Sequence, residues 1–349
     1  MRGETDLDDR QQEVLASVVR QYVSTGAPVG SKAVVAQFSG PLSSATVRHV
    51  MAELEAAGYL THPHTSAGRV PVDKAYRFYI DRLTQLTRLE PATERYIDES
   101  LASESVPMDG LMERISFILS KVSNHLGVVL GPALEEKLLE HIKFVQLPDS
   151  RVLAVVVSRP DLIESKIFRV EGELTQEELD RAADFLNAEF RGWSLRTIRI
   201  EMAEWMERMK AASDRLLTTV VSLFMWGALA EEQPGPLFVG GTVKILDQPE
   251  FFDLEKVKEL WKAIEEKAKV VKILSACLDA PHGGVQALIG HENPNLEMRQ
   301  CSVIIAPYHY RQRPVGALGV IGPTRMEYDR AITTVAYVAQ VTSRLLSAN

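Results

Sequence analysis

The sequence has few of the residues that build disulfide frameworks, metal sites or membrane spans. Only two cysteines occur in 349 residues, Cys277 and Cys301, and no Cys-x-x-Cys pair is present, which argues against a disulfide framework and a zinc ribbon. The longest apolar run, from Val220 to Ala230, is too short for the roughly 20 residues that cross a bilayer. The first residues, Met1 to Asp9, are polar and acidic, so we expect no signal peptide, no membrane partner and a cytoplasmic protein.

Motifs of nucleotide-dependent and hydrolytic enzymes are also missing. Gly316, Gly319 and Gly322 lack the spacing of a dinucleotide fingerprint, and the chain has neither a Gly-Lys-Ser/Thr loop nor a Gly-x-Ser-x-Gly elbow. His62 and His64 are close in sequence, but no carboxylate or thiol lies near them to complete a metal site. We therefore expect no catalytic residue, no metal and no cofactor, and we expect that the protein is not an enzyme.

Charge is distributed unevenly along the chain. The formal net charge is −8, which argues against a protein that binds nucleic acid over its whole surface. The segment from Arg20 to Tyr79 differs, because it holds six basic residues against three acidic ones, a balance of +3. A mildly basic head on an acidic body suits a specific DNA-binding protein whose non-specific binding is weak.

The N-terminal segment predicts three helices followed by a pair of short strands. Carboxylates at Asp8 and Asp9 favour the start of a first helix, which Gly26 and Pro28 end. Two further helices are expected to be capped by Ser31 and Ser43, the second of them closed by Gly58, and strands are expected at residues 59–61 and 69–70 around a turn. This order of elements is typical of a winged helix-turn-helix.

The third helix carries the candidate DNA contacts. Its apolar stripe, Val47, Val50, Met51 and Leu54, is expected to be buried, which leaves four polar residues free to face out. We expect Arg48 and His49 to reach base edges, and Ser44 and Thr46 to contact phosphates. The remaining candidates lie on the second helix and in the wing: Ser31, Lys32, Ser66 and Arg69. Each of these residues, taken alone, is also compatible with an ordinary solvated surface.

The rest of the chain predicts an α+β body. Helices are expected at residues 73–98, 111–126, 254–267 and 328–346, with a linker at 102–109 and a mostly helical stretch at 175–230 that includes a possible strand at 197–200. Strands are expected at residues 141–147, 152–158, 163–170, 285–289, 301–308 and 315–321. We interpret the six strands as one sheet, which the helical middle interrupts as an insertion.

Long blocks of the sequence resemble one protein family. The blocks are 25–31 (TGAPVGS), 42–48 (LSSATVR), 51–55 (MAELE), 64–79 (HTSAGRVPVDKAYRFY), 239–242 (VGGT), 248–251 (QPEF) and 314–326 (PVGALGVIGPTRM). They are similar to the heat-inducible transcription repressor HrcA family along almost the whole chain. Members of that family usually have Asn after the recognition-helix Arg, whereas this sequence has His49. Since Asn can bond adenine bidentately and His cannot, the base preference is expected to differ.

The resemblance implies three domains. We expect a winged helix-turn-helix at residues 1–75, a connecting helix and linker at 76–110, a GAF-like domain in two parts at 111–172 and 236–349, and an inserted dimerisation domain at 173–235. It also implies a homodimer that binds an inverted-repeat operator and represses chaperone and chaperonin operons. The family further implies that the GroEL chaperonin keeps the repressor active, and that heat removes this support.

Three alternatives remain open at this stage. The first is a metabolite-sensing repressor, because GAF-like folds often hold a small ligand; its candidate residues are Arg299, Tyr308, His309 and Arg311. The second is an enzyme fused to a DNA-binding head. The third is a protein–protein module built on a degenerate winged helix, against which the basic residues Arg48, Arg69 and Lys74 argue only weakly.

Overall fold

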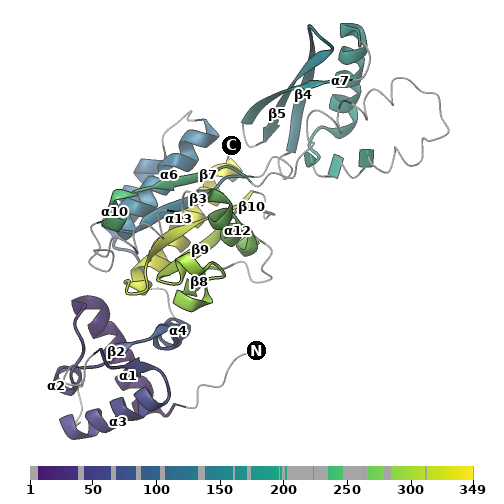
Figure 1. The fold of residues 1–349 in the computed structure, drawn as a ribbon. Helices are drawn as coiled ribbons and strands as arrows, with labels where there is room; N and C mark the ends of the chain where they lie inside the picture. The colour runs from purple at the N-terminus through teal and green to yellow at the C-terminus, as the bar shows by residue number, and fades with distance from the viewer. Residues whose placement is uncertain are drawn as a thin grey trace.

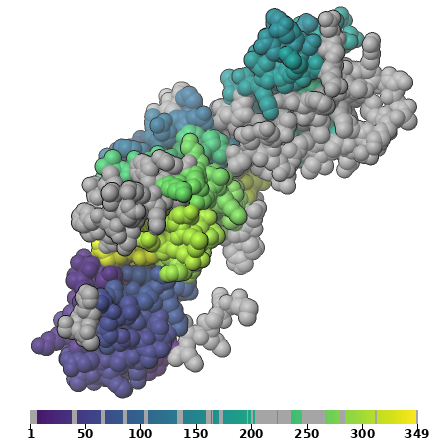
Figure 2. Space-filling view, in the orientation of Figure 1, coloured from purple at the N-terminus to yellow at the C-terminus, as the bar shows by residue number. Residues whose placement is uncertain are grey.

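The computed structural model of the chain has three parts that follow one another in a row (Figure 1). The structure describes residues 7–37, 43–63, 68–83, 88–102, 107–132, 138–159, 162–170, 174–195, 197–198, 201–202, 223, 235–246, 262, 266–278, 284–310 and 313–348. We call the parts the head unit (residues 8–81), the central unit (a five-stranded sheet with its helices) and the outer unit (a three-stranded sheet with one helix). The space-filling view shows the head unit resting directly on the central unit (Figure 2).

The head unit contains the elements predicted from its sequence, in the predicted order. They are α1 (Asp9–Thr25), α2 (Ser31–Val35), α3 (Ser44–Ala56), β1 (Leu60–Thr61), β2 (Val70–Pro71) and, in addition, α4 (Asp73–Asp81). Asp8 caps α1 by accepting from the amide of Gln11, and Gly26 ends it at a φ of 67°, where glycine has no steric cost. The two strands pair antiparallel, with Leu60 opposite Pro71.

The central unit is a sheet with helices on both faces. Its strands are β3 (Leu126–Leu130), β7 (Leu237–Gly240), β8 (Gln286–Ile289), β9 (Cys301–Tyr310) and β10 (Arg313–Pro323), all antiparallel, in the order β7-β3-β10-β9-β8. Helices α6 (Met108–Ser123) and α13 (Tyr328–Ala348) cover one face, with α5 (Pro91–Leu101) behind them, and α12 (Lys267–Leu278) covers the other. The short elements α10 (Val243–Leu246), η4 (Gly290–Glu292) and η5 (Leu296–Met298) complete the described part of this unit.

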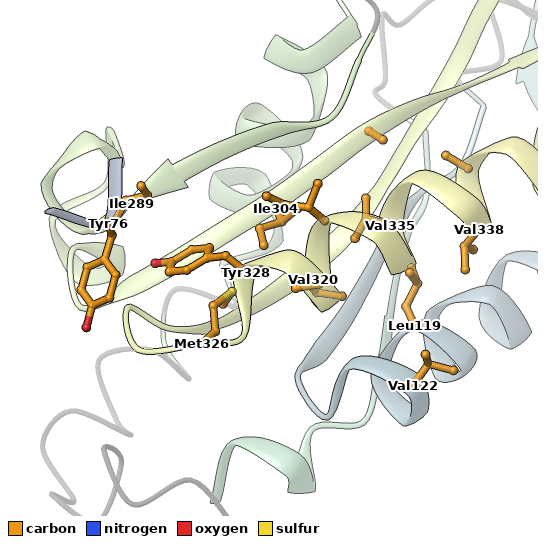
Figure 3. Packing of buried hydrophobic residues seen from close by; sticks show 14 of the residues in the cluster. Tyr76, Leu119, Val122, Ile289, Ile304, Val320, Met326, Tyr328, Val335 and Val338 are labelled. Atoms are coloured by element: carbon orange, nitrogen blue, oxygen red, sulfur yellow. The ribbon is translucent and has the colours of Figure 1, made fainter. Parts of the chain in front are cut away.

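The apolar core of the head unit continues into the central unit without a break. Buried side chains of α1 and α3 belong to the same cluster as those on the α6 and α13 face of the sheet. Figure 3 shows this junction, where Tyr76 of α4 lies beside Tyr328 and Ile289 of the central unit. The opposite face of the sheet packs against α12 in a separate cluster. The position of the head unit is therefore set partly by shared core packing.

The outer unit is inserted between two neighbouring strands of the central sheet. It consists of β4 (Leu138–Leu147), β5 (Arg151–Arg159), β6 (Leu162–Arg169) and α7 (Gln176–Phe190), and has its own apolar core. The chain leaves the central sheet after β3 and returns at β7, where the amide of Gly131 donates to the carbonyl of Pro236 (2.8 Å). The side chain of Asn187 on α7 is hydrogen bonded to both the amide and the carbonyl of Ile142 on β4 (2.8 and 2.9 Å). These bonds connect α7 to β4, which is an edge strand of the sheet.

Several sequence expectations for the body are wrong. The strands predicted within residues 141–170 do not join the central sheet, because β4, β5 and β6 pair with one another in a sheet of their own. Two strands of the central sheet, β3 and β7, were not predicted. The helix expected over 73–98 is two helices, α4 and α5, and residues 197–198 of the expected strand are helical. The helix expected at 254–267 lies almost wholly outside the described residues.

Candidate nucleic-acid interface

Helix α3 presents its first two turns to solvent. Ser43 caps the helix by accepting from the amide of Thr46 (3.0 Å), as predicted. Val47, Val50, Met51 and Leu54 are buried, which confirms the predicted stripe and fixes which side of the helix faces out. Arg48 lies on that outer side, is exposed, and has no ion-pair or hydrogen-bond partner within the described part of the chain. The guanidinium group of Arg48 is therefore free to contact a ligand.

His49 is also on the outer side, with a neighbour on its own helix. Its side chain is 77% exposed, and its Nε2 lies 3.2 Å from a carboxylate oxygen of Glu53, one turn further along α3. An exposed pair of this kind contributes little to stability, so it does not hold the ring away from an approaching surface. Arg48 and His49 therefore lie side by side on the same exposed surface.

The hydroxyl groups of the candidate set connect helices α2 and α3. Ser31 and Ser44 are hydrogen bonded through their Oγ atoms (2.8 Å), and the hydroxyl of Thr46 bonds that of Ser43 (2.9 Å). Lys32 is exposed on α2. The expected capping role of Ser31 is wrong, because α2 begins at Ser31 itself and Gly30 occupies the cap position without a side-chain bond. Ser31 and Ser44 thus fix the angle between the two helices.

Arg69 is held within the head unit. Its Nε lies 2.9 Å from a carboxylate oxygen of Glu55 on α3, its Nη1 is 2.9 Å from Nδ1 of His62, and its side chain is 16% exposed. Its backbone exchanges two hydrogen bonds with Val29 (2.8 and 2.9 Å), which ties the second strand to the start of α2. Ser66 lies outside the described residues. Glu55 and His62 support the wing through Arg69, but no pattern in the sequence predicts this contact.

Lys74 makes the connection from the end of α3 to α4. Its ammonium group donates to the carbonyl of Ala57 (3.0 Å) and lies 4.1 Å from the centre of the Tyr59 ring. A lysine at the C-terminal end of a helix satisfies a carbonyl that has no partner in the helix and is favoured by the helix dipole. Part of the basic charge of the head unit therefore stabilises it, whereas Lys32 and Arg48 are exposed on α2 and α3.

The chain matches known proteins along its whole length. Residues 109–332 match the family described as HrcA protein C terminal domain. A heat-inducible transcription repressor HrcA of Geobacter sulfurreducens is 37% identical over 342 residues, covering 98% of this chain and 99% of the relative. The chain belongs to the HrcA family of heat-inducible transcription repressors. The counterpart from Syntrophobacter fumaroxidans is 34% identical with the same 98% coverage of both chains.

A solved structure shares the HrcA-family fold seen here. It is described as the crystal structure of a hypothetical protein at 2.2 Å resolution, has a TM-score of 0.65 and 20% identity, and covers 98% of this chain and 99% of its own. This similarity supports the α+β architecture. Among the helices that the structure describes, none has the length and apolar character of a membrane span.

One of the residues considered for a small ligand belongs to the apolar core. Tyr308 is fully buried, and its hydroxyl donates to the carbonyl of Leu130 (2.9 Å), so it is part of the core; Arg311 lies outside the described residues. Over the described ranges, no group of three or more His, Cys, Asp and Glu side chains could hold a metal ion. Burial raises the pKa of the Cys277 thiol to about 11 and that of Cys301 to about 12, which keeps both thiols protonated at neutral pH.

Proposed function

We propose that the head unit is a winged helix-turn-helix and that the protein represses transcription by binding inverted-repeat operator DNA through α3. The observation that carries this proposal is the exposed face of the first turns of α3, with Arg48 free of described partners while the opposite stripe is buried. An α-helix fits the major groove of DNA, where each base pair presents a distinct pattern of donors and acceptors. Membership of a repressor family supports this assignment.

The individual contacts follow from the positions of the side chains. We assign Arg48 and His49 to base edges. We assign Ser44 and Thr46 to phosphates because their side chains are short, and Ser31 and Lys32 to phosphates because they lie on α2. Ser66 and Arg69 are assigned to the wing. Contact between Arg69 and a phosphate requires its ion pair with Glu55 to open, so we expect it to contribute less than Arg48.

We propose that two copies of the chain read the two half-sites, joined through the outer unit. One face of its sheet packs on α7, whereas the other bears apolar side chains; Ile163 is 73% exposed and Ile167 is 56% exposed. These residues stand opposite Val157 and Leu153 on β5, so the two apolar pairs lie on the same face of the sheet. An exposed apolar surface of this kind marks an interaction site more often than a solvated face. We therefore place the dimerisation domain at β4–β6 and α7, a larger insertion than residues 173–235.

The operator proposal is tested by DNA binding in solution. A duplex recovered by in vitro selection with the wild-type protein is titrated by fluorescence anisotropy, beside a duplex that keeps only one half-site. We expect the selected duplex to be an inverted repeat and the single half-site to bind much more weakly, because the second half-site binds at high effective concentration. Recovery of no enriched sequence, or equal affinity for both duplexes, would contradict the proposal.

The dimer proposal is tested by analytical ultracentrifugation. The double variant Ile163→Asp with Ile167→Asp is expected to sediment as a monomer, because two charges would be buried without partners at the interface. A matched control, Phe117→Asp, changes an equally exposed apolar residue of the central unit (60% exposed) and is expected to leave the dimer intact. A double variant that remains dimeric would place the contact elsewhere.

We further propose that the target operons encode chaperones and that the GroEL chaperonin keeps the repressor active in the cytoplasm. The heat-inducible character of the family supports this proposal, because a repressor that needs a chaperone loses activity when unfolded proteins occupy that chaperone. Operator titration after mild heating, with and without purified chaperonin and ATP, tests it. We expect the chaperonin to raise the active fraction, and an unchanged active fraction would remove this part of the account.

A further inference from the structure

Two sequence blocks that carry the family resemblance contact the central unit in a way that DNA binding does not explain. Residues of the block 64–79 meet the turn η4, and residues of the block 25–31 meet the end of the block 314–326. Both contacts lie at the junction between the head unit and the central unit, which Figure 3 shows around Tyr76 and Tyr328. The junction combines the shared apolar core with polar connections. One is a hydrogen bond from the Tyr79 hydroxyl on α4 to Asp329 on α13 (3.2 Å), and three others involve charged side chains of Asp73, Arg77 and Arg325.

The first connection joins the start of α4 to η4. A carboxylate oxygen of Asp73 accepts from the amide of His291 (2.9 Å) and lies 2.7 Å from Nδ1 of the same residue. Gly290 adopts a φ of 49°, and a Cβ at this position would collide with the Asp73 carboxylate. Both the left-handed backbone and the lack of a side chain are therefore needed for this close approach.

The second connection is an ion pair one turn further along α4. Arg77 donates through Nε to Glu292 (2.8 Å) and through Nη2 to the same carboxylate and to the carbonyl of Ala287 (2.6 Å). The hydrogen bond to Glu292 raises the pKa of Arg77 above its ordinary value. Glu292 also accepts from the amide of Ile289 (2.9 Å), so the acceptor is held by its own backbone. Because the planar guanidinium group forms several hydrogen bonds at once, it fixes the orientation of α4 relative to η4 as well as their distance.

The third connection reaches the end of α1 from the central unit. Arg325 donates to the carbonyl of Val23 (2.7 Å), one of the carbonyls that the helix leaves without an internal partner. Its guanidinium lies against Gly26, where a Cβ would be 3.4 Å from the guanidinium carbon. Between these connections, the rings of Tyr76 and Tyr328 pack with their centres 5.6 Å apart. The head unit is thus held at α1 and, on α4, at Asp73, Arg77 and Tyr79.

We propose that Asp73, Arg77 and Arg325 are positioning residues which fix the head unit on the central unit and thereby set the half-site spacing that the dimer accepts. The proposal rests on the proposed operator binding. A dimer whose heads cannot pivot matches one separation of half-sites, because one added base pair rotates a half-site by about 34° around the DNA axis and moves it along that axis. Heads released from these connections pivot, and then accept neighbouring spacings.

The test uses full-length protein and a series of duplexes built on the selected inverted repeat, with the spacer shortened or lengthened by one or two base pairs. For the wild type we expect a loss of about tenfold in affinity for each base pair of change. For the double variant Arg77→Ala with Arg325→Ala we expect a nearly flat profile, within about threefold, with weaker binding at the original spacing. The matched control is Arg82→Ala, because Arg82 directly follows α4 and its side chain contacts only Gln12 and Phe78 of the head unit among the interactions described.

Hydrogen–deuterium exchange without DNA gives a second readout in the same variants. The amide of His291 is bonded to Asp73, which the double variant leaves in place, so faster exchange at residues 290–292 reports release of the head unit. We expect this acceleration in the double variant and not in Arg82→Ala. Slow exchange together with a sharp spacing profile in the double variant would overturn the positioning inference, whereas a wild type that selects no inverted repeat would overturn the proposed function itself.

Discussion

Replacement of Arg48 by alanine is expected to change DNA recognition with little effect on stability. The side chain is exposed and has no partner among the described residues, so we expect the free energy of unfolding to change by less than about 0.5 kcal/mol. A lost base contact costs about 1–3 kcal/mol. Because the dimer carries the change in both half-sites, the expected loss is about 2–6 kcal/mol, which is a factor of about 30 to 2 × 10⁴ in affinity.

The assay is anisotropy titration of the selected inverted repeat and of an unrelated duplex of equal length, with circular-dichroism melting of each variant. Arg95→Ala is the charge-matched control, because Arg95 is exposed on α5 in the central unit and bonds only the carbonyl of Pro91 on its own helix among the interactions described. We expect Arg48→Ala to lose its preference for the selected duplex and Arg95→Ala to keep it. Wild-type affinity and preference in Arg48→Ala would show that the first turns of α3 do not read bases.

Three further outcomes follow from the structure. Ser43→Ala removes the cap of α3 and is expected to destabilise the protein by about 0.5–2 kcal/mol in urea unfolding; an unchanged midpoint would show that the cap is not needed. Leu54→Ala, at a fully buried position, is expected to cost about 2–5 kcal/mol in the same assay, and a loss below 1 kcal/mol would contradict the packing described for α3. Since burial raises the pKa of both thiols, Cys277 and Cys301 are expected to resist a thiol reagent at pH 7.5 and to react fully in denaturant; rapid reaction of the native protein would show that they are accessible.

The head unit could be predicted from its sequence because its signals are local. Apolar spacing, the Ser43 cap and glycines at Gly26 and Gly58 each determine structure within a few residues, and all of them are found as predicted. The buried stripe of α3 followed in the same way, and with it the outward positions of Arg48 and His49. Their contact with DNA stays a prediction.

The body was harder to predict because its pairings are distant in sequence. Strand β3 is a short, wholly buried run that directly follows α6, so its apolar residues continue the pattern of the helix and gave no sign of a strand. Its partner β10 lies nearly 200 residues further on, and β7 follows only after the whole outer unit. The alternation of apolar and polar residues within β4–β6 predicts that these segments are strands. It does not predict which sheet the strands join.

The junction between the head unit and the central unit shows a further limit of sequence reasoning. Asp73 and His291 are 218 positions apart, and Arg77 and Glu292 are 215 apart, so no spacing rule connects them. The only sequence signal was the length of the blocks that carry the family resemblance, which exceeds what DNA contact alone requires. Block 64–79 supplies Asp73 and Arg77 to the junction, whereas their partners His291 and Glu292 lie outside the blocks.

The most direct test of the account places a cleaving group on α3 itself. Ala45, which is exposed in the first turn, is replaced by cysteine and coupled to an iron chelate, while the buried Cys277 and Cys301 are expected to stay unlabelled. On the selected duplex, the account predicts two clusters of strand cleavage related by the symmetry of the inverted repeat, one in each half-site. Cleavage spread evenly along the duplex, or the same clusters from a chelate placed on Arg95→Cys in the central unit, would contradict it.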